Sequence, residues 1–270
     1  MSTPVVALRG ARLAFGDRLL WDHLDLTVAA GEFIAVLGPN GTGKTSLLKV
    51  LLGQLPLSAG TALIAGRTVQ SGSELIGYVP QHRAVDRGLS LRGCDMVQLG
   101  IDGHRWGIAP LRRAGRMRRR EAVTRALAQV QAVSLAKVPV GVMSGGELQR
   151  VRVAQALASD PVLLLCDEPL LNLDPGNARL VAGLIDRRRR TGTAVLFVTH
   201  EINPVLPYVD RILYLVNGRF RIGTVGEVMT TETLSELYQA DIRVIQVGNR
   251  YVVVGEHLDH SGHTLGHTHD

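Results

Sequence analysis

Near the start of the chain runs the octapeptide Gly38-Pro39-Asn40-Gly41-Thr42-Gly43-Lys44-Thr45. It fits the phosphate-loop pattern G-x-x-x-x-G-K-[ST]. The apolar run Glu32–Leu37 before it predicts a buried strand, and the spacing of leucines over Lys44–Leu52 after it predicts a helix ended by Gly53. A polyphosphate needs several backbone N–H groups converging on it, and glycines let the chain wrap that closely. We therefore expect Lys44 to reach the β- and γ-phosphates of a bound nucleotide and the Thr45 hydroxyl to hold Mg²⁺.

A second, acidic element agrees with this interpretation. The apolar run Val162–Cys166 is followed directly by Asp167 and Glu168. A carboxylate at the end of a buried strand can hold Mg²⁺, and its neighbour can polarise the water that attacks a γ-phosphate. The alternative, a pair that caps a helix before Pro169, would explain one carboxylate but not both. The two elements together predict a nucleoside triphosphatase that uses Mg²⁺, without yet showing which kind.

The rest of the chain alternates short apolar runs with helical stretches, which predicts an α/β fold with a mainly parallel sheet. Alternating segments in the first thirty residues favour an N-terminal antiparallel β subdomain. Residues 83–158 are expected to form a helical insert, and the apolar runs around Gly248-Asn249 indicate a hairpin in a small C-terminal extension. We expect strands at Ala62–Ala65, Ile76–Val79, Val162–Cys166, Ala194–Val198 and Ile212–Val216, and helices at Met117–Val133 and Gly146–Ala158.

Composition excludes several classes of protein. The 270 residues are 46% hydrophobic and 20% charged, which is typical of one or two globular domains. No apolar run is long enough to span a bilayer, and the first residues do not fit a signal peptide, so a cytoplasmic chain is expected. The two cysteines, Cys94 and Cys166, exclude a disulfide scaffold, and Cys166 is expected to be a buried small hydrophobe.

The net charge of +6 comes mainly from arginine. One cluster comprises Arg112, Arg113, Arg116, Arg118, Arg119 and Arg120, and the other runs from Arg187 to Arg190. Such clusters fit either an anionic partner, such as nucleic acid or a membrane surface, or a solvated helix face. Aromatic residues make up only 4% of the chain and do not alternate with the arginines, so no nucleic-acid partner is expected.

A third motif indicates which kind of nucleoside triphosphatase the chain is. It reads Met143-Ser144-Gly145-Gly146-Glu147-Leu148-Gln149-Arg150. It resembles the signature L-S-G-G-Q of ATP-binding cassette (ABC) ATPases and stands, as in that family, shortly before the acidic strand. The resemblance covers about Val5 to Val225. It implies that Phe15 stacks on adenine and that Gln81 links Mg²⁺ to a membrane partner. It also implies that Asp174 lies in the loop between two cassettes and that His200 contacts the γ-phosphate. Glu168, His200 and Gln81 are thus the expected catalytic group, with Thr45, Gln81 and Asp167 at Mg²⁺.

The resemblance also implies a head-to-tail dimer in which Ser144, Gly145, Gly146 and position 147 of each copy complete the ATP site of the other. Two positions depart from the family pattern. Met143 replaces leucine, which preserves volume. Glu147 replaces glutamine, and because a carboxylate near a γ-phosphate would be repelled, we expect it to face the ribose.

A single cassette without a membrane domain resembles the separate ATPase subunit of a bacterial importer, bound to permease subunits at the cytoplasmic face of the plasma membrane and coupled indirectly to a substrate-binding protein. The whole sequence is similar to the ATPase subunits of manganese and zinc importers. Two alternatives stay open: an ATPase for another ABC transporter, such as one for iron chelates or an exporter, and a non-transport ABC ATPase of DNA repair or translation. A phosphoryl-transfer kinase would leave the Ser144-Gly145-Gly146 motif unexplained. The expected division is an ATPase domain over 1–232, the extension over 233–256 and a tail over 257–270.

The tail is rich in histidine, at His257, His260, His263, His267 and His269. Imidazole suits zinc, nickel and copper, so a loose transition-metal site is one interpretation. The other is a flexible tail without a role.

Overall fold

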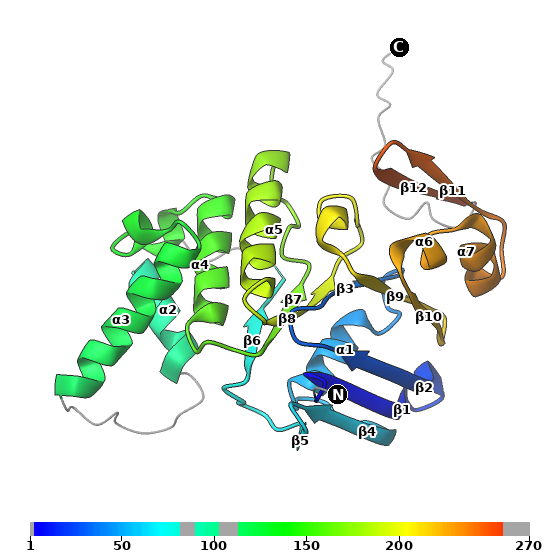
Figure 1. Cartoon of the computed structure of the whole chain (residues 1–270), viewed down its shortest axis with the longest axis horizontal. Helices are drawn as coiled ribbons and strands as arrows, with labels where there is room; N and C mark the ends of the chain where they lie inside the picture. Colours follow the sequence, from blue (N-terminus) through cyan, green and yellow to red (C-terminus); the bar gives the residue numbers. More distant parts are fainter. Residues whose placement is uncertain (1–2, 82–89, 103–112, 256–270) are drawn as a thin grey trace, which may run out of the picture.

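The computed structural model describes residues 3–81, 90–102 and 113–255, and its centre is a six-stranded sheet (Figure 1). The strand order is β10-β9-β3-β8-β7-β6, all parallel except β10, which pairs with β9 in the antiparallel sense. The strands are β3 (Phe33–Leu37), β6 (Ile76–Val79), β7 (Leu163–Asp167), β8 (Ala194–Val198), β9 (Arg211–Val216) and β10 (Arg219–Gly223). Every residue of β3, β7 and β8 is buried, which explains why these strands read as unbroken apolar runs.

Alternation along β3 divides the core in two. Phe33, Ala35 and Leu37 pack into one hydrophobic cluster, and Ile34 and Val36 pack into the other. The second cluster holds α1 (Lys44–Leu51) against a four-stranded antiparallel sheet, as expected for the N-terminal part. That sheet has the order β2-β1-β4-β5, with β1 (Val6–Phe15), β2 (Arg18–Val28), β4 (Ala59–Ile64) and β5 (Arg67–Thr68).

The helical insert lies between β6 and β7 in the chain and forms the left-hand part of Figure 1. It contains α2 (Gly93–Asp102), α3 (Arg113–Gln129), the short turns η1 (Val133–Leu135) and η2 (Val140–Val142), and α4 (Gly145–Leu157). The helix expected over Met117–Val133 starts earlier and ends at Gln129, because Gln131 takes a left-handed backbone (φ 55°) that a helix does not continue through. Next to the insert stands α5 (Pro175–Arg189), which the sequence analysis did not predict.

The end of the described chain contains η3 (Leu206–Tyr208), α6 (Val225–Val228), α7 (Thr231–Tyr238), β11 (Ile242–Val247) and β12 (Arg250–Gly255). The expected hairpin is confirmed: β11 and β12 pair antiparallel across Gly248-Asn249, with Gly248 at φ 58°. Residue 233, where the extension was expected to begin, lies inside α7. Leu234 and Leu237 of this helix belong to the same hydrophobic cluster as Phe33. The histidines of the tail lie outside the described residues.

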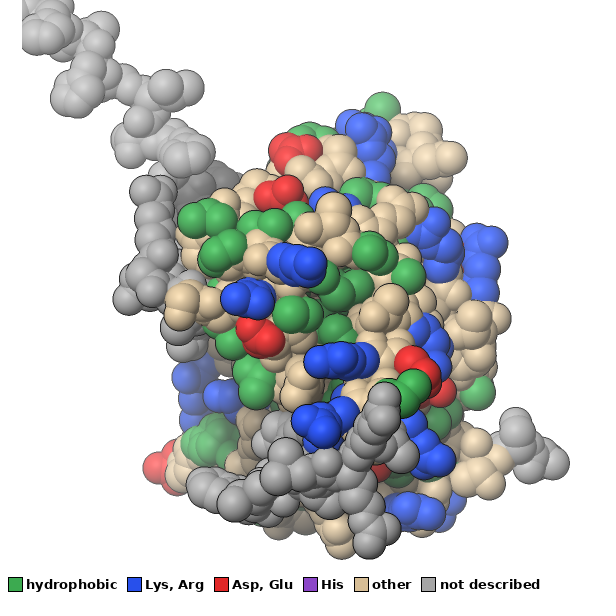
Figure 2. Space-filling model, turned by 90° about the vertical axis from the view of Figure 1, so that its left-hand side faces the viewer, with side chains coloured by type: hydrophobic (Ala, Val, Ile, Leu, Met, Phe, Trp, Pro, Cys, Tyr) green, Lys and Arg blue, Asp and Glu red, His purple; other side chains and the backbone are tan. Residues whose placement is uncertain are grey.

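The two arginine clusters differ in their surroundings. In the second, Arg188 pairs with Asp160 and Arg189 with Asp210, so these two arginines connect α5 to neighbouring segments. Arg189 and Arg190 also pair with Asp186 within the end of α5. In the first, Arg116, Arg118 and Arg120 are exposed, and on the face of the insert the basic side chains lie scattered among hydrophobic ones (Figure 2). No helix in the described ranges has both the length and the apolar character needed to cross a bilayer.

Candidate functional site

The phosphate loop (residues 38–45) connects β3 to α1, in the strand–loop–helix order that the sequence predicted. Gly38 has φ 135°, and a Cβ there would lie 2.0 Å from the Leu215 carbonyl oxygen, so the close backbone approach requires glycine. Gly43 (φ 98°) is the N-cap of α1 and provides no side-chain acceptor for the first turn. The N–H groups that begin α1 are therefore available to an anion, and the helix dipole favours one there.

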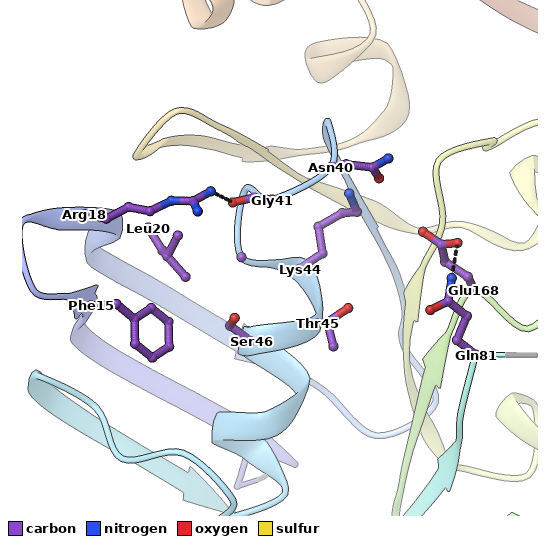
Figure 3. Close-up of a pocket in the computed structure, with 11 residues that line it drawn as sticks. Phe15, Arg18, Leu20, Asn40, Gly41, Lys44, Thr45, Ser46, Gln81 and Glu168 are labelled. Carbon is purple, nitrogen blue, oxygen red and sulfur yellow. Dashed lines mark hydrogen bonds between the residues drawn. The ribbon is translucent and has the colours of Figure 1, made fainter. Parts of the chain in front are cut away.

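The loop borders a pocket of about 380 Å³. Figure 3 shows its lining, which comprises Phe15, Arg18, Leu20, Asn40, Gly41, Gly43, Lys44, Thr45, Ser46, Gln81 and Glu168. The structure thus brings together the phosphate loop, one end of the antiparallel sheet and two members of the expected catalytic group.

Lys44 is buried over the loop, and its Nζ donates to the carbonyl oxygens of Gly38 (2.6 Å) and Pro39 (2.8 Å). Burial lowers the pKa of Lys44, while the nearby carboxylates of Glu168 and Asp167 act in the opposite direction. The ammonium group is held in place before any phosphate is bound, so little side-chain freedom is lost on binding.

Asp167 ends β7 beside the loop. Its Oδ1 accepts from the Thr45 hydroxyl (3.2 Å) and its Oδ2 from the Tyr78 hydroxyl (3.4 Å). Burial is the main cause that raises the pKa of Asp167, against the hydrogen bonds from Thr45 and Tyr78. A hydroxyl and a buried carboxylate side by side are oxygen ligands of the kind Mg²⁺ prefers, and a cation would offset the cost of burying this charge. The residues present therefore fit a magnesium ion.

Glu168 is the centre of the expected catalytic group. Its Oε2 accepts from Gln81 Nε2 (3.2 Å) and lies 3.6 Å from His200 Nδ1. Glu168 has a left-handed backbone (φ 47°), an uncommon conformation for a residue with a Cβ, and backbone strain of this kind is often present at functional sites. Gln81, Glu168 and His200 are thus brought together from three separate segments.

Phe15, at the end of β1, is half exposed and lines the same pocket, in a position suited to stacking on a base. The sequence analysis missed Arg18, whose Nη2 donates to the Gly41 carbonyl oxygen (2.8 Å), and it missed Leu20 and Tyr78. Arg18 follows the turn after Phe15, a local signal that could have pointed to it, whereas Tyr78 is brought to Asp167 only by the pairing of β6 with β7.

The signature turn (residues 143–150) begins α4, with Ser144 as its N-cap. Glu147 turns back onto this residue: its Oε2 accepts from the Ser144 backbone N–H (2.9 Å) and from the Ser144 hydroxyl (2.9 Å). The carboxylate is thus engaged within the turn itself, and its expected position facing a ribose of the partner's nucleotide stays a prediction. Among the described residues that line the phosphate-loop pocket, none comes from the signature turn. In Figure 1, α4 stands beside α5, whereas α1 lies on the other side of the central sheet.

Asp174 caps α5, accepting from the backbone N–H groups of Gly176 and Asn177 (3.0 Å each) and from Asn177 Nδ2 (2.6 Å). The Asn177 amide also packs on the signature turn, since a Cβ on Gly146 would lie 2.4 Å from it. The start of α4 and the start of α5 are therefore in direct contact. A second pocket of about 230 Å³ next to them is lined by Glu168, Asn172, Leu173, Thr199 and His200, among others.

Comparison with known proteins places the chain in a family. The sequence pattern described as "ABC transporter" matches residues 21–171, more than half of the chain. The chain belongs to the ABC transporter family and is one of its ATPases, which confirms the expected fold and the expected enzyme class.

Two curated relatives and one solved structure show which members of the family the chain is similar to. A manganese transport system ATP-binding protein of Listeria monocytogenes is 31% identical over 86% of this chain and 95% of its own length. A zinc import ATP-binding protein of Paramagnetospirillum magneticum is 38% identical over 77% of this chain and 72% of its own length. A solved ABC transporter in an inward-facing conformation has a TM-score of 0.77 and 25% identity, covering 93% of this chain and 96% of that one.

Proposed function

We propose that the chain is the ATP-hydrolysing subunit of an ABC transporter that imports a divalent metal, manganese or zinc, and that it acts at the cytoplasmic face of the plasma membrane. The observation that carries the ATPase part is the meeting of Lys44 and Glu168 at one pocket, with Asp167 hydrogen-bonded to Thr45 of the same pocket. The metal part is supported by the manganese and zinc relatives. The transporter's permease subunits are the direct partners, and a substrate-binding protein acts through them.

The residues of the pocket divide the reaction between them. Lys44 binds the β- and γ-phosphate oxygens, and Phe15 stacks on adenine. Bound Mg²⁺, held by Thr45 and Asp167, supplies neutralisation of the phosphate charge. Glu168 accepts the proton of the attacking water: its Oε2 faces Gln81 and His200, so its Oε1 is the oxygen left for the water. The other ring nitrogen of His200 is left for the γ-phosphate.

The signature turn completes the site from a second copy of the chain. It does not line its own pocket, its Ser144 and Gly145 are exposed, and the start of a helix binds anions. We infer a head-to-tail dimer in which two ATP molecules lie between the copies, so ATP strengthens the dimer and hydrolysis weakens it. Closing and opening would move the permease halves.

The test is metal uptake in cells. Cells from which the chain is deleted should contain less manganese or zinc. The wild-type chain should restore the content, whereas Glu168→Gln, present at the same level, should not. An unchanged content of both metals would contradict metal import.

A second candidate is an ATPase for another transporter of the family. A hemin import ATP-binding protein of Streptomyces coelicolor is 34% identical over 89% of this chain, which keeps iron chelates open. Restoration of hemin uptake, with both metals unchanged, would favour this candidate.

We further propose that the histidines after Gly255 bind a transition metal weakly. A chain ending at Gly255 should lose Zn²⁺ binding in a calorimetric titration, and Mn²⁺, which prefers oxygen ligands, should bind the full chain more weakly than Zn²⁺. Identical titrations of the two chains would contradict a metal site in the tail.

A further inference from the structure

Two helices of the molecule start with the same contact. At α4, Glu147 Oε2 accepts from the backbone N–H and the hydroxyl of Ser144, at 2.9 Å each. At α6, Glu227 Oε2 accepts from the backbone N–H (2.8 Å) and the hydroxyl (2.9 Å) of Thr224. Both pairs have the Ser/Thr-x-x-Glu spacing of a capping box. Only the first stands where the proposed function requires a contact with phosphate.

The contact determines what Ser144 can offer a ligand. A serine hydroxyl has one proton, and here Glu147 accepts it, as it also accepts the backbone N–H of Ser144. Phosphate oxygens are acceptors and need donors. The Ser144 oxygen also accepts from the Glu147 backbone N–H (3.4 Å), so while Glu147 holds the hydroxyl, Ser144 has one lone pair and no donor left for a ligand. Of the turn's donors, the N–H groups of Gly145 and Gly146 remain for an anion.

We propose that Glu147 restrains the signature turn. The Ser144 hydroxyl donates its hydrogen bond to the Glu147 carboxylate, and it must donate instead to the γ-phosphate of the ATP bound by the partner copy before the dimer closes. The inference rests on the proposed function, in which Ser144 of one copy contacts the ATP of the other. Glu147 then raises the ATP concentration at which the dimer forms.

Charge adds to the restraint. The backbone N–H and then the hydroxyl of Ser144 lower the pKa of Glu147, so the carboxylate is ionised at neutral pH. Arg150 also lowers this pKa, but its Nη1 donates to the Gln131 carbonyl oxygen (2.7 Å). A negative charge therefore stands next to the place where the phosphate arrives. Glutamine keeps the length of the side chain and an acceptor but removes the charge.

The experiment measures dimer formation by the full-length chain. All variants carry Glu168→Gln to slow hydrolysis, and sedimentation measures the dimer fraction while ATP is raised at constant Mg²⁺. Glu147→Gln should lower the ATP concentration for half-maximal dimer by about fivefold or more, since a hydrogen bond to a charged group is stronger than one to a neutral group. Glu147→Ala, which removes the acceptor, should lower it as well.

Glu227→Gln is the matched control, because it removes the same charge from the same contact on a helix outside the site. It should leave the ATP midpoint unchanged. Equal midpoints for Glu147→Gln and the parent, or a higher midpoint for Glu147→Gln, would overturn the restraint.

A second measurement separates the two levels of inference. Trp21 is fully buried, and its indole nitrogen lies 3.0 Å from the position of a Cβ on Gly43, so its fluorescence should report ATP at the phosphate loop. The other tryptophan, Trp106, is replaced by Phe for this purpose. If every variant binds ATP but none dimerises, the proposed dimer is wrong and the restraint with it. If all dimerise at one ATP concentration, only the restraint is wrong.

Discussion

The helices α1 and α4 begin in opposite ways. The N-cap of α1 is Gly43, which has no side chain to accept from the first turn, whereas the N-cap of α4 is Ser144, engaged in both directions with Glu147. Both ends carry the same backbone N–H groups and the same positive dipole. The first is open to a ligand from its own chain's pocket, and the second is occupied by its own side chains. We therefore expect the start of α1 to bind nucleotide within one chain, whereas a ligand at the start of α4 must compete with Glu147 for Ser144.

The expected catalytic residues are also concentrated near the start of α1. Lys44, Asp167 and Glu168 interact there, and Gln81 and His200 flank the last of these. The start of α4 offers hydrogen-bond donors and a carboxylate. A substitution at one helix end should therefore leave the role of the other end unchanged.

The largest expected effect is on the chemical step. Glu168→Gln should reduce the ATP turnover rate by about 10²- to 10⁴-fold, the usual contribution of a general base, because the amide cannot accept the proton of water. ATP binding to the single chain should persist, since Lys44 and the loop are untouched. Single-turnover hydrolysis and a Trp21 fluorescence titration measure the two properties. If Glu168→Gln keeps most of the turnover rate, Glu168 is not the base.

Elements fixed by local sequence were predicted closely. The helix after the phosphate loop begins at Lys44 as expected, and the strands at Ile76–Val79 and Ala194–Val198 match the observed bounds. Glycine geometry determines the first, and the strands are short apolar runs of which Ala194–Val198 is fully buried. The helix α5 was missed, although Asp174 as N-cap and Pro175 as first residue are local signals for its start.

Contacts made by the tertiary fold could not be predicted. Tyr78 of β6 donates to Asp167 of the neighbouring strand β7, and Asn177 of α5 contacts Gly146 of the neighbouring helix α4. The turn of Glu147 onto Ser144 is different, since its Ser-x-x-Glu spacing is visible in the sequence. Glu147 thus differs from the family glutamine in charge and also caps the helix through Ser144.

The second prediction compares the two helix ends by ATP affinity. Lys44→Ala removes a cation that binds phosphate oxygens and should weaken ATP binding to the single chain by about 10- to 100-fold. Ser144→Ala should leave this affinity unchanged, because Ser144 does not line the pocket. Calorimetry measures both variants. Equal losses would show that α4 contributes to the pocket of its own chain.

The third prediction uses two glycines at equivalent positions, the second residue of α4 and of α6. A Cβ on Gly146 would push the Asn177 amide away from Asp174, whereas a Cβ on Gly226 meets nothing within 4 Å. Gly146→Ala should reduce ATP-dependent dimer formation several-fold in the Glu168→Gln background, and Gly226→Ala should not. Because Gly226→Ala meets no neighbouring atom, it should keep its thermal stability, and Gly146→Ala should lose at most the contribution of the displaced Asn177 hydrogen bond. Equal dimer midpoints would show that the contact with Asn177 has no part in dimer formation.

The smallest expected effect concerns stability and pH. Backbone and hydroxyl donors lower the pKa of Glu147 and of Glu227 in the folded chain, in the same order of importance. A carboxyl whose folded pKa is lowered stabilises the fold above its unfolded pKa, and this contribution is lost as pH falls through the folded pKa. Glu147→Gln and Glu227→Gln should therefore both lower the thermal midpoint slightly at neutral pH, and the difference from wild type should disappear in acid below the folded pKa. A pH series of melting curves measures this.

Similar stability losses, combined with unequal dimer midpoints, would show that the two contacts are equivalent as caps and differ only because the start of α4 meets the partner's phosphate. A large stability loss in Glu147→Gln alone would instead make the α4 contact a structural requirement of the insert.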